Sequence, residues 1–573
     1  MFLIKVAAAA VNQTPLDWDG NRQNILAAMD AARRQQVSVL CLPELCITGY
    51  GCEDAFHSTG IQEIAQQVLL EIAPQTAGMI VSVGLPLLYS GGLFNAACLI
   101  ADGRIVGFAA KQNLAGEGIH YEPRWFKPWP ADVRAEVQIN GDTYAIGDLI
   151  FDCGGVMIGF EICEDAWVAN RPGGDLAAGG ADIILNPSAS HFAFGKQEIR
   201  RRFVLEGSRA FGVTYVYANL LGNEAGRAIY DGGALIASGG RMVAEGPRFL
   251  FADFHLTSAV VDIDATRQQR SRISSFQPDV TDEKANAIVA DVEFPSLKPA
   301  TSPAPLPDWE SGAVIKEEEF TRAVALGLLD YLRKSRSQGF VVSLSGGADS
   351  SSVATLVALA VRFAQAEIGS DGLRRKLVYM SGLPADANDP AWIHRLLTCI
   401  YQSTRNSSDT TRTAAAELAA ALGANFLEFD VDAIVDSYVD MVSAGMGRDL
   451  TWQTDDLALQ NIQARARAPG VWMVANIQGA LLLSTSNRSE AAVGYATMDG
   501  DTSGGLAPIA GIDKAYLRRW LIWMEREGPQ GIGPLPALSL VNQQQPTAEL
   551  RPPQAGQTDE DDLMPYEVLD AIE

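Results

Sequence analysis

Histidine is scarce in this chain, and basic residues are fewer than acidic ones. Only five of the 573 residues are histidines, and 44 Lys and Arg residues stand against 69 Asp and Glu residues, for a net charge of −25. Nucleic acids and anionic membrane surfaces need clustered Lys and Arg, so neither is an expected partner. No uninterrupted apolar run approaches the roughly 18 residues that cross a membrane. The strand-like residues 1–11 lack a basic leader, so no secretory signal is expected.

Disulfide bonds and zinc clusters are not expected either. The cysteines are odd in number and contain no Cys-x-x-Cys pair; they are Cys41, Cys46, Cys52, Cys98, Cys153, Cys163 and Cys399. Such a set favours reduced thiols and a cytoplasmic location. The first three are wrongly spaced for zinc, so buried structural cysteines are expected there. Haem and flavin are not expected.

A lysine is also missing from the most informative glycine-rich turn. An apolar strand runs into Ser-Gly-Gly-Ala-Asp-Ser at residues 345–350, and an apolar helix follows. Gly346 and Gly347 let the backbone approach an anion, Ser345 and Ser350 supply hydroxyl donors, and the start of the helix favours negative charge. Because no lysine follows the glycines, this is not the usual P-loop. The turn resembles the pyrophosphate-binding loop of ATP pyrophosphatases, and a turn that binds nothing is the alternative.

Two α/β domains separated by a linker are predicted. Short apolar strands alternate with helical segments over residues 1–275, and a similar pattern returns over 313–573. Between them, the range 276–312 contains the proline-rich residues 294–307, which cannot continue a helix or a central strand. This range is therefore the predicted linker.

Three residues with complementary chemistry each follow a predicted strand in the first domain. They are Glu44, Lys111 and Cys163, and strand ends of α/β folds bring distant parts of a chain together. A carboxylate can take the proton of a thiol, and an ammonium can stabilise the oxyanion that forms when a thiolate attacks an amide. Taken singly, each residue also has a structural explanation, as a cap, a solvated lysine and a small buried residue. A lysine-based triad would explain how so histidine-poor a chain can be a hydrolase.

The order and the flanking residues of these motifs resemble the nitrilase, or carbon–nitrogen hydrolase, superfamily over residues 1–263. The resemblance implies an αββα sandwich with Glu44 as general base, Lys111 as oxyanion cation, Cys163 as nucleophile and Glu122 as a supporting carboxylate. A glutaminase is the member implied, with a glutamine pocket lined by Tyr50, Trp167, Ser190 and Lys196. Residues 115–120 depart from the Leu-Pro-x-Tyr pattern that is common there.

Polar side chains gather at predicted element ends in the second domain. Asn461 and Arg465 lie four residues apart and share one helical face, which is either a ligand face or a solvated one. Glu490 follows an apolar run, and with Asp349 it can hold Mg²⁺ against the phosphates of ATP. Lys514, after a predicted loop, can neutralise charge on the transferring group.

Taken in order, all these segments resemble the glutamine-dependent NAD synthetases, and residues 546–550 and 557–566 resemble the C-terminus of that family. The resemblance implies a nitrilase-type glutaminase fused to a doubly wound parallel-sheet ATP pyrophosphatase domain, of the adenine nucleotide α-hydrolase type. ATP would bind at Ser345, Gly346, Gly347, Asp349, Ser350, Arg405 and Thr485. Deamido-NAD would bind at Asn461, Arg465, Glu490, Asp501 and Glu560, with Mg²⁺ on Asp349 and Glu490 and a catalytic cation at Lys514. The range 387–408 is longer than in many relatives.

The implied reaction has two halves. Cys163 would form a glutamyl thioester and release ammonia, and ATP would adenylate deamido-NAD, from which ammonia displaces AMP to give NAD. A shielded tunnel would keep ammonia from protonating in water, and a homo-oligomer is expected. Three alternatives are another glutamine-dependent ATP pyrophosphatase that amidates a different carboxylate, a stand-alone amidase with a regulatory nucleotide-binding domain, and an inactive scaffold.

Overall fold

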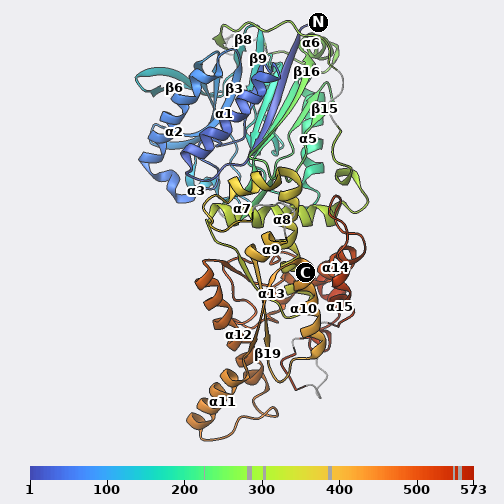
Figure 1. Ribbon diagram of the computed structural model, residues 1–573. Coiled ribbons are helices and arrows are strands. Elements are labelled where there is room, and N and C mark those ends of the chain that lie inside the picture. The colour runs from blue at the N-terminus through green and yellow to red at the C-terminus, as the bar shows by residue number, and fades with distance from the viewer. Residues whose placement is uncertain are drawn as a thin grey trace. The chain divides into compact units, whose positions relative to one another are not determined.

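Two units follow one another along the chain, Met1–Glu310 and Ser311–Glu573, in the computed structural model (Figure 1). The structure describes residues 1–224, 226–279, 287–300, 305–384, 390–545, 547, 549–552 and 558–572. Each unit is built from β-sheets flanked by helices, so the predicted α/β class is confirmed for both.

Two mixed sheets form the centre of the first unit. Among the described residues, the first sheet has the order β16 (Phe254–Asp262), β1 (Leu3–Val11), β2 (Val39–Cys41), β3 (Ile80–Tyr89), β4 (Gly92–Ala101), β5 (Arg104–Ala110), β7 (Asp142–Gly147) and β6 (Arg134–Ile139). The second has the order β15 (Arg241–Glu245), β14 (Leu235–Ser238), β11 (Thr214–Asn219), β10 (Ile183–Ser188), β9 (Val156–Phe160), β8 (Phe151–Cys153) and β17 (Ile288–Ala290). A separate ribbon joins β12 (Leu221–Glu224) to β13 (Ala228–Asp231).

Helices cover the outer faces of these sheets and complete the predicted αββα sandwich. They are α1 (Trp18–Arg34), α2 (Thr59–Ile72), α4 (Pro172–Ala178) and α5 (Lys196–Phe211), and α6 (Ile263–Arg272) directly follows β16. Along β1, Val6 and Ala8 lie in the core between the sheets, whereas Ala7 and Ala9 pack with α1 and α2. Successive side chains of a strand point to opposite faces, so a strand buried on both faces is apolar throughout. The shorter pieces are η1 (Glu53–His57), η2 (Ala73–Thr76), α3 (Glu122–Trp125) and η3 (Cys163–Ala166).

The predicted linker, residues 276–312, is partly built into the first unit. Strand β17 pairs in parallel with β8 at the edge of the second sheet, and η4 (Asp308–Ser311) follows. Arg248 Nε donates to Glu310 Oε2 at 2.7 Å, which fastens the end of the range to the same unit. An edge strand has a partner on one side only and tolerates proline, so the proline-rich composition of this range did not reveal strand β17. Residues 280–286 and 301–304 lie outside the described residues.

A parallel sheet forms the centre of the second unit, with the order β20 (Asn425–Asp430), β19 (Leu397–Ser403), β18 (Phe340–Ser343) and β21 (Leu481–Leu483). Val341 of β18 packs with Val471 and Ala475 of α12 (Asp456–Gln478), while Val342 faces the other side of the sheet. The helices around the sheet include α7 (Ile315–Lys334), α8 (Ala348–Lys376), α9 (Ala391–Leu396), α10 (Asp409–Leu422) and α11 (Asp432–Met446). The C-terminal part contributes α13 (Arg488–Val493), α14 (Lys514–Arg526), η5 (Pro536–Leu538), α15 (Ser539–Asn542), α16 (Asp559–Asp562) and α17 (Tyr566–Ile572).

The strand order reverses between β18 and β21. Such a switch point opens a crevice at the carboxyl ends of the two strands, where α/β proteins bind their ligands. Helix α8 starts directly after β18 and is interrupted at Gly369, where φ is 65°. By length and composition α8 could cross a membrane, but 67% of its most apolar stretch is buried inside the protein, as in a core helix.

Candidate active sites

Lys111 joins two carboxylates in the interior of the first unit. Its ammonium donates to Glu44 Oε1 at 2.6 Å and to Glu122 Oε1 at 2.8 Å, and none of the three side chains is exposed to solvent. Glu44 follows β2, Lys111 follows β5 and Glu122 starts α3. Further donors fix the carboxylates: Asn95 Nδ2 binds Glu44 Oε1 at 2.7 Å, and the Ala189 N–H binds Glu44 Oε2 at 3.0 Å. The predicted meeting of Glu44 and Lys111 is therefore confirmed, and Glu122, which the resemblance implied as a supporting carboxylate, joins them.

Cys163 stands at the end of β9 with a left-handed backbone, at φ 48°. Non-glycine residues adopt this conformation at a cost, and such strain is concentrated at functional sites. The residue is 5% exposed, so its thiol lies in the interior beside the buried cluster. Burial raises the pKa of the Cys163 thiol, the Glu44 carboxylate raises it further and the Lys111 ammonium lowers it. The thiol is therefore protonated at rest and needs a base to become a nucleophile.

Glu44 has the properties of that base. Burial raises its pKa to about 7, Lys111 opposes the rise and the Glu122 carboxylate adds to it. Burial by itself would lower the pKa of Lys111, yet the carboxylates of Glu122 and Glu44 raise that pKa well above its ordinary value. The lysine thus stays an ammonium, and a carboxyl group that titrates near neutral pH is suited to general base catalysis.

The four residues predicted to line a glutamine pocket take different places. The Tyr50 hydroxyl donates to Glu122 Oε1 at 2.8 Å, within the buried cluster. Lys196 Nζ lies 5.4 Å from the centroid of the Trp167 ring, so these two are neighbours. The Ser190 hydroxyl accepts from Arg200 Nε at 3.2 Å. The role of all four in binding glutamine stays a prediction.

The glycine-rich turn of the second unit joins β18 to α8 at the switch point. Ser345 Oγ lies 3.0 Å from Ser350 Oγ and accepts from the Gly347 N–H at 3.3 Å, so the hydroxyls hold the turn in shape. Gly346 has φ 82°, and a Cβ there would lie 2.2 Å from the carbonyl oxygen of Thr411. Glycine is therefore required, and α8 begins beside the crevice, where the free N–H groups of its first turn favour negative charge.

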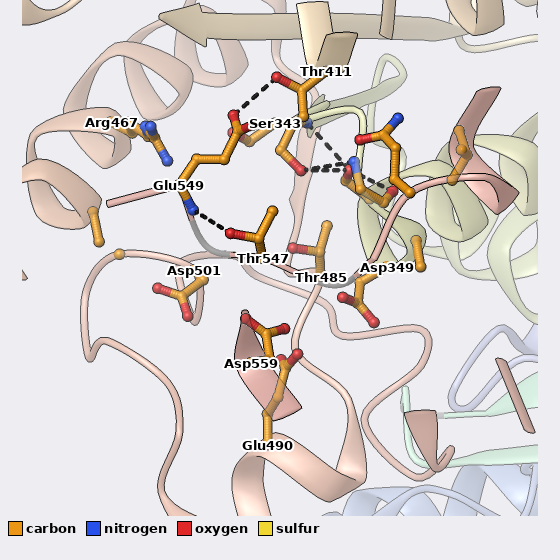
Figure 2. Close-up of a pocket in the computed structure, with 18 of the residues that line it drawn as sticks. Ser343, Asp349, Thr411, Arg467, Thr485, Glu490, Asp501, Thr547, Glu549 and Asp559 are labelled. Carbon is orange, nitrogen blue, oxygen red and sulfur yellow. Dashed lines mark hydrogen bonds between the residues drawn. The ribbon is translucent and has the colours of Figure 1, made fainter. Parts of the chain in front are cut away.

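A cavity of about 250 Å³ opens in front of this turn (Figure 2). Most of the predicted ATP and metal residues line it, namely Ser345, Gly347, Asp349, Ser350, Thr485 and Glu490. Asp501, predicted for deamido-NAD, and Lys514, the predicted catalytic cation, line it as well. Figure 2 shows Asp349, Glu490, Asp501 and Asp559 reaching the cavity from four separate segments. Among the described lining residues, carboxylates outnumber basic side chains. The basic ones are Lys514, Arg467 and Arg518.

Lys514 is the cation between two of these carboxylates. Its ammonium forms an ion pair with Asp349 and a second with Glu490 Oε1 at 3.0 Å. Burial raises the pKa of Glu490 to about 7, the charge of Asp349 adds to the rise and Lys514 opposes it. Asn487, which the sequence did not single out, donates to Asp349 Oδ1 at 2.9 Å and caps α13. Both carboxylates are thus oriented toward one positive charge.

Arg467 is a lining residue that was missed from the sequence. The residue is half-buried, its Nε is buried and has no hydrogen-bond partner among the described residues, and burial lowers its pKa. The spacing of four residues grouped Asn461 with Arg465 on one face of the helix. Arg465 and Arg467 are two apart, and residues two apart on a helix point to nearly opposite sides. Arg465 is accordingly exposed, and Arg467 is the one that reaches the cavity.

Comparison with known proteins gives the same division of the chain. A carbon-nitrogen hydrolase family model matches residues 5–270, and an NAD synthase family model matches residues 320–572. A glutamine-dependent NAD(+) synthetase from Oryza sativa subsp. indica is 32% identical and covers 99% of this chain and 81% of its own length. The Homo sapiens enzyme of that name is 31% identical, with 98% of this chain and 83% of its own covered. The chain belongs to the glutamine-dependent NAD(+) synthetase family.

Solved structures of the glutamine-dependent NAD(+) synthetases share the whole architecture. One from Cytophaga hutchinsonii is 42% identical, has a TM-score of 0.81 and covers 100% of this chain and 86% of its own. One from Acinetobacter baumannii, solved with adenosine diphosphate, is 20% identical with a TM-score of 0.70, and covers 100% of this chain and 93% of its own. The predicted order of a nitrilase-like domain and an NAD synthetase domain is thereby confirmed.

The residues predicted for deamido-NAD in this NAD synthetase fold do not all reach the cavity. Asn461 Oδ1 accepts from Thr497 Oγ1 at 2.9 Å, Arg465 Nε donates to the Met498 carbonyl at 3.0 Å, and Asp501 accepts from the Thr497 N–H. These three therefore meet at the loop 497–501 beside the cavity, and only Asp501 lines it. Glu560 is placed apart from them, because it forms an ion pair with Arg518 at 3.5 Å.

Arg405 is not brought to the cavity. The side chain is exposed and forms ion pairs with Asp432 and Asp436 of α11. It follows β19, whereas the switch point lies between β18 and β21, so its strand end opens one position away from the ligand crevice. Of the irregular range 387–408, residues 387–389 lie outside the described residues, as do Pro546, Ala548 and Gln557 of the C-terminal motifs.

The donor set of the predicted ATP site fits Mg²⁺. No group of three or more His, Cys, Asp or Glu side chains is placed to hold a metal within the described ranges. Magnesium, however, usually takes one or two protein carboxylates and completes its shell with water and substrate phosphate oxygens. Asp349 and Glu490 provide two carboxylates that already face one cation, the Lys514 ammonium.

Proposed function

We propose that the two units carry out the two half-reactions of a glutamine-dependent NAD synthetase. The chain is a glutamine-hydrolysing ligase of that family, and the main prediction is favoured over a different ATP pyrophosphatase, an amidase or an inactive scaffold. The observation that carries the proposal is the pairing, in one chain, of the buried Glu44–Lys111–Glu122 cluster beside Cys163 with the glycine-rich turn before Asp349.

In the first half-reaction, Glu44 takes the thiol proton of Cys163 and the sulfur attacks the side-chain amide of glutamine. An ammonium has three N–H donors; Glu44 and Glu122 accept two from Lys111, and the third is assigned to the oxyanion. Glu44 then gives its proton to the leaving nitrogen, so ammonia departs and a glutamyl thioester remains. Water activated by Glu44 hydrolyses the thioester and releases glutamate.

In the second half-reaction, the turn at residues 345–350 binds the phosphates of ATP through N–H groups and hydroxyls. The nicotinic acid carboxylate of deamido-NAD attacks the α-phosphorus, pyrophosphate leaves, and ammonia then displaces AMP to form the amide of NAD. Lys514 is assigned to the charge that develops during these transfers, and Arg467 to a phosphate. Mg²⁺ held by Asp349 and Glu490 would offset phosphate charge, which the excess of carboxylates in the cavity makes necessary.

A shielded passage of ammonia from the first half-reaction to the second is part of the proposal. Support comes from the chemistry, because ammonia that reaches water at neutral pH is protonated and loses its nucleophilic lone pair. An enzyme trap that consumes free ammonia should therefore leave the yield of NAD from glutamine unchanged while it removes the yield from added ammonium. Equal losses from both nitrogen sources would show that ammonia passes through bulk water.

We also propose a cytoplasmic location and a homo-oligomer, with glutamine, ATP and deamido-NAD as the binding partners. All seven cysteines are free thiols and buried, which suits a reducing compartment.

Helix α11 has no buried residue and exposes Ile434, Tyr438, Met441 and Val442. Such a patch is typical of an interface, and Met441→Asp should lower the assembled mass in sedimentation, whereas Val378→Asp, at another exposed apolar position, should not.

The central experiment uses Cys163→Ala with ATP, Mg²⁺, deamido-NAD and either glutamine or ammonium. We expect NAD formation from glutamine to be lost and NAD formation from ammonium to survive, because only the first half-reaction needs the thiol. Cys153→Ala is the matched control, since Cys153 is also buried in the first unit but lies in β8. Loss of both activities in a folded Cys163→Ala protein would contradict separate active sites.

A further inference from the structure

A line of hydrogen bonds runs from the buried cluster toward the surface of the first unit. The Tyr50 hydroxyl donates to Glu122 Oε1 at 2.8 Å and lies 3.2 Å from His120 Nδ1. His120 Nε2 lies 2.9 Å from His191 Nδ1, and Lys196 Nζ lies 3.2 and 3.4 Å from the two ring nitrogens of His191. Tyr50 is 8% exposed, while both histidines are half-buried, so the line leads outward.

Other contacts fix the outer end of this line. Arg200 is fully buried, is paired with Asp231 at 2.6 Å, and donates to the carbonyl oxygens of Ser190 at 2.8 Å and His191 at 2.7 Å. His191 therefore sits on a rigid support. The positions of both imidazoles are set by the fold, and neither has a part in the reaction steps proposed above.

The proposed glutamine hydrolysis leaves one proton behind for each ammonia that departs neutral. When the Sγ–C bond forms and the C–N bond breaks, the thiol proton passes through Glu44 to the nitrogen. When water attacks, the O–C bond forms and the C–S bond breaks; one water proton returns to Sγ through Glu44. The other stays on the product carboxyl group and is lost as that acid ionises. The cluster around Lys111 is not exposed, so this proton has no direct contact with bulk water.

We propose that Tyr50, His120 and His191 form a relay that carries this proton from Glu122 to the surface. Glu44, again a carboxylate, takes the proton that the product carboxyl group loses and passes it to Lys111 as Lys111 passes one to Glu122, so the lysine remains an ammonium. Glu122 then gives a proton to the Tyr50 oxygen, Tyr50 gives its own to His120 Nδ1, and His120 Nε2 gives one to His191 Nδ1. The proton on His191 Nε2 leaves to solvent beside Lys196.

The resting hydrogen bonds match the state after such a transfer. Tyr50 has one O–H and donates it to Glu122, so it accepts from His120 Nδ1, and His120 Nε2 in turn accepts from His191 Nδ1. His191 Nε2 is then the acceptor that faces Lys196 Nζ. Rotation of the Tyr50 O–H from Glu122 toward His120, together with exchange of the two imidazole tautomers, resets the relay for the next turnover.

The surroundings of both rings keep them neutral, as a relay requires. Burial lowers the pKa of His120 to about 4; Lys196 and Lys111 add to the fall, and Glu122 opposes it. Burial lowers the pKa of His191 to about 3, and Lys196, His120 and Arg200 add to the fall. A neutral imidazole can accept at one nitrogen while it donates at the other, whereas an imidazolium can only donate.

The test is rescue of glutamine hydrolysis by imidazole in a weakly buffered assay of the full chain. For His120→Ala and His191→Ala we expect the kcat for glutamate release to fall about 10²-fold with little change in the KM for glutamine. Added imidazole should restore kcat in proportion to its concentration, because a diffusing base replaces the missing ring. His120→Gln keeps a polar side chain but cannot relay, so it should show the same loss and rescue.

Two controls separate a relay from a structural effect. His57→Ala removes an exposed histidine of the same unit and should change neither kcat nor its response to imidazole. NAD formation from ammonium should be unaffected in every variant. A wild-type kcat, or a loss that lies in KM and does not respond to imidazole, would overturn the relay. The relay rests on the proposed glutaminase, and wild-type chain that releases no glutamate would instead refute that function.

Discussion

Lys111 Nζ lies 2.6 Å from Glu44 Oε1, and both side chains are completely buried. A buried ion pair of this kind is costly to assemble, since both charges lose their water, and costly to break, since removing one partner leaves the other charge unpaired. Glu122 increases both costs, because it adds a second buried carboxylate to the same ammonium. The cluster is thus held for its chemistry at the expense of stability.

Lys111→Met should therefore destabilise the first unit as well as abolish glutamine hydrolysis. We expect a loss of about 3–5 kcal/mol in the free energy of unfolding, because two carboxylates remain buried without a cation. Denaturant unfolding that resolves the transition of the first unit would measure it. Lys127→Met removes an exposed lysine and should stay within about 0.5 kcal/mol of wild type. Similar stability of the two variants would contradict an ionised cluster.

The rate of glutamate release should rise with pH and level off above about pH 7. Burial raises the pKa of Glu44 to about 7, and only its carboxylate form can take the thiol proton, so activity grows as protons are lost. Because the charge of Glu122 raises that pKa, Glu122→Gln should move the acid limb to lower pH. A limb that stays in place, measured as kcat/KM for glutamine hydrolysis, would show that another group controls it.

The sequence predicted the first site more completely than the second, for a physical reason. Glu44, Lys111 and Cys163 each follow a strand, and strand ends converge whatever the details of the loops. By contrast, the placement of Arg467 instead of Arg465 depends on the rotation of one helix against the sheet. The contact of His120 with His191 joins two loops whose shapes no periodic pattern encodes.

In the fold as well, long regular segments could be predicted from the sequence and short ones could not. The alternation of strands and helices in both units follows from apolar periodicity, whereas the αββα layers were implied by the family resemblance. Strand β17 was missed because a strand of three residues at a sheet edge carries too short a pattern, and it lies in a range rich in proline further on. Its pairing with β8 is decided by tertiary contacts.

Lys514→Met should impair NAD formation and spare glutamine hydrolysis, whereas Cys163→Ala should abolish glutamine hydrolysis and spare NAD formation from ammonium. NAD formation should fall by about 10²- to 10³-fold with glutamine and with ammonium alike, because the variant lacks the cation between Asp349 and Glu490. Glutamate release from glutamine should continue. Lys376→Met, near the far end of α8, is the matched lysine control. Survival of ammonium-dependent synthesis in Lys514→Met would remove this lysine from the second half-reaction.

Gly346→Ala should abolish ATP binding without unfolding the chain. The new Cβ would lie 2.2 Å from the Thr411 carbonyl oxygen, and φ is 82°, so the turn must shift and its N–H groups and hydroxyls lose their alignment. Gly447→Ala is a strict control: φ there is 68°, but no atom lies within 4 Å of its Cβ, so it carries the left-handed cost of about 1 kcal/mol alone. Equilibrium dialysis with labelled ATP would compare the two. If Gly346→Ala bound ATP as tightly as Gly447→Ala, the phosphates would not lie against this turn, and the excess of carboxylates in the cavity would need another explanation.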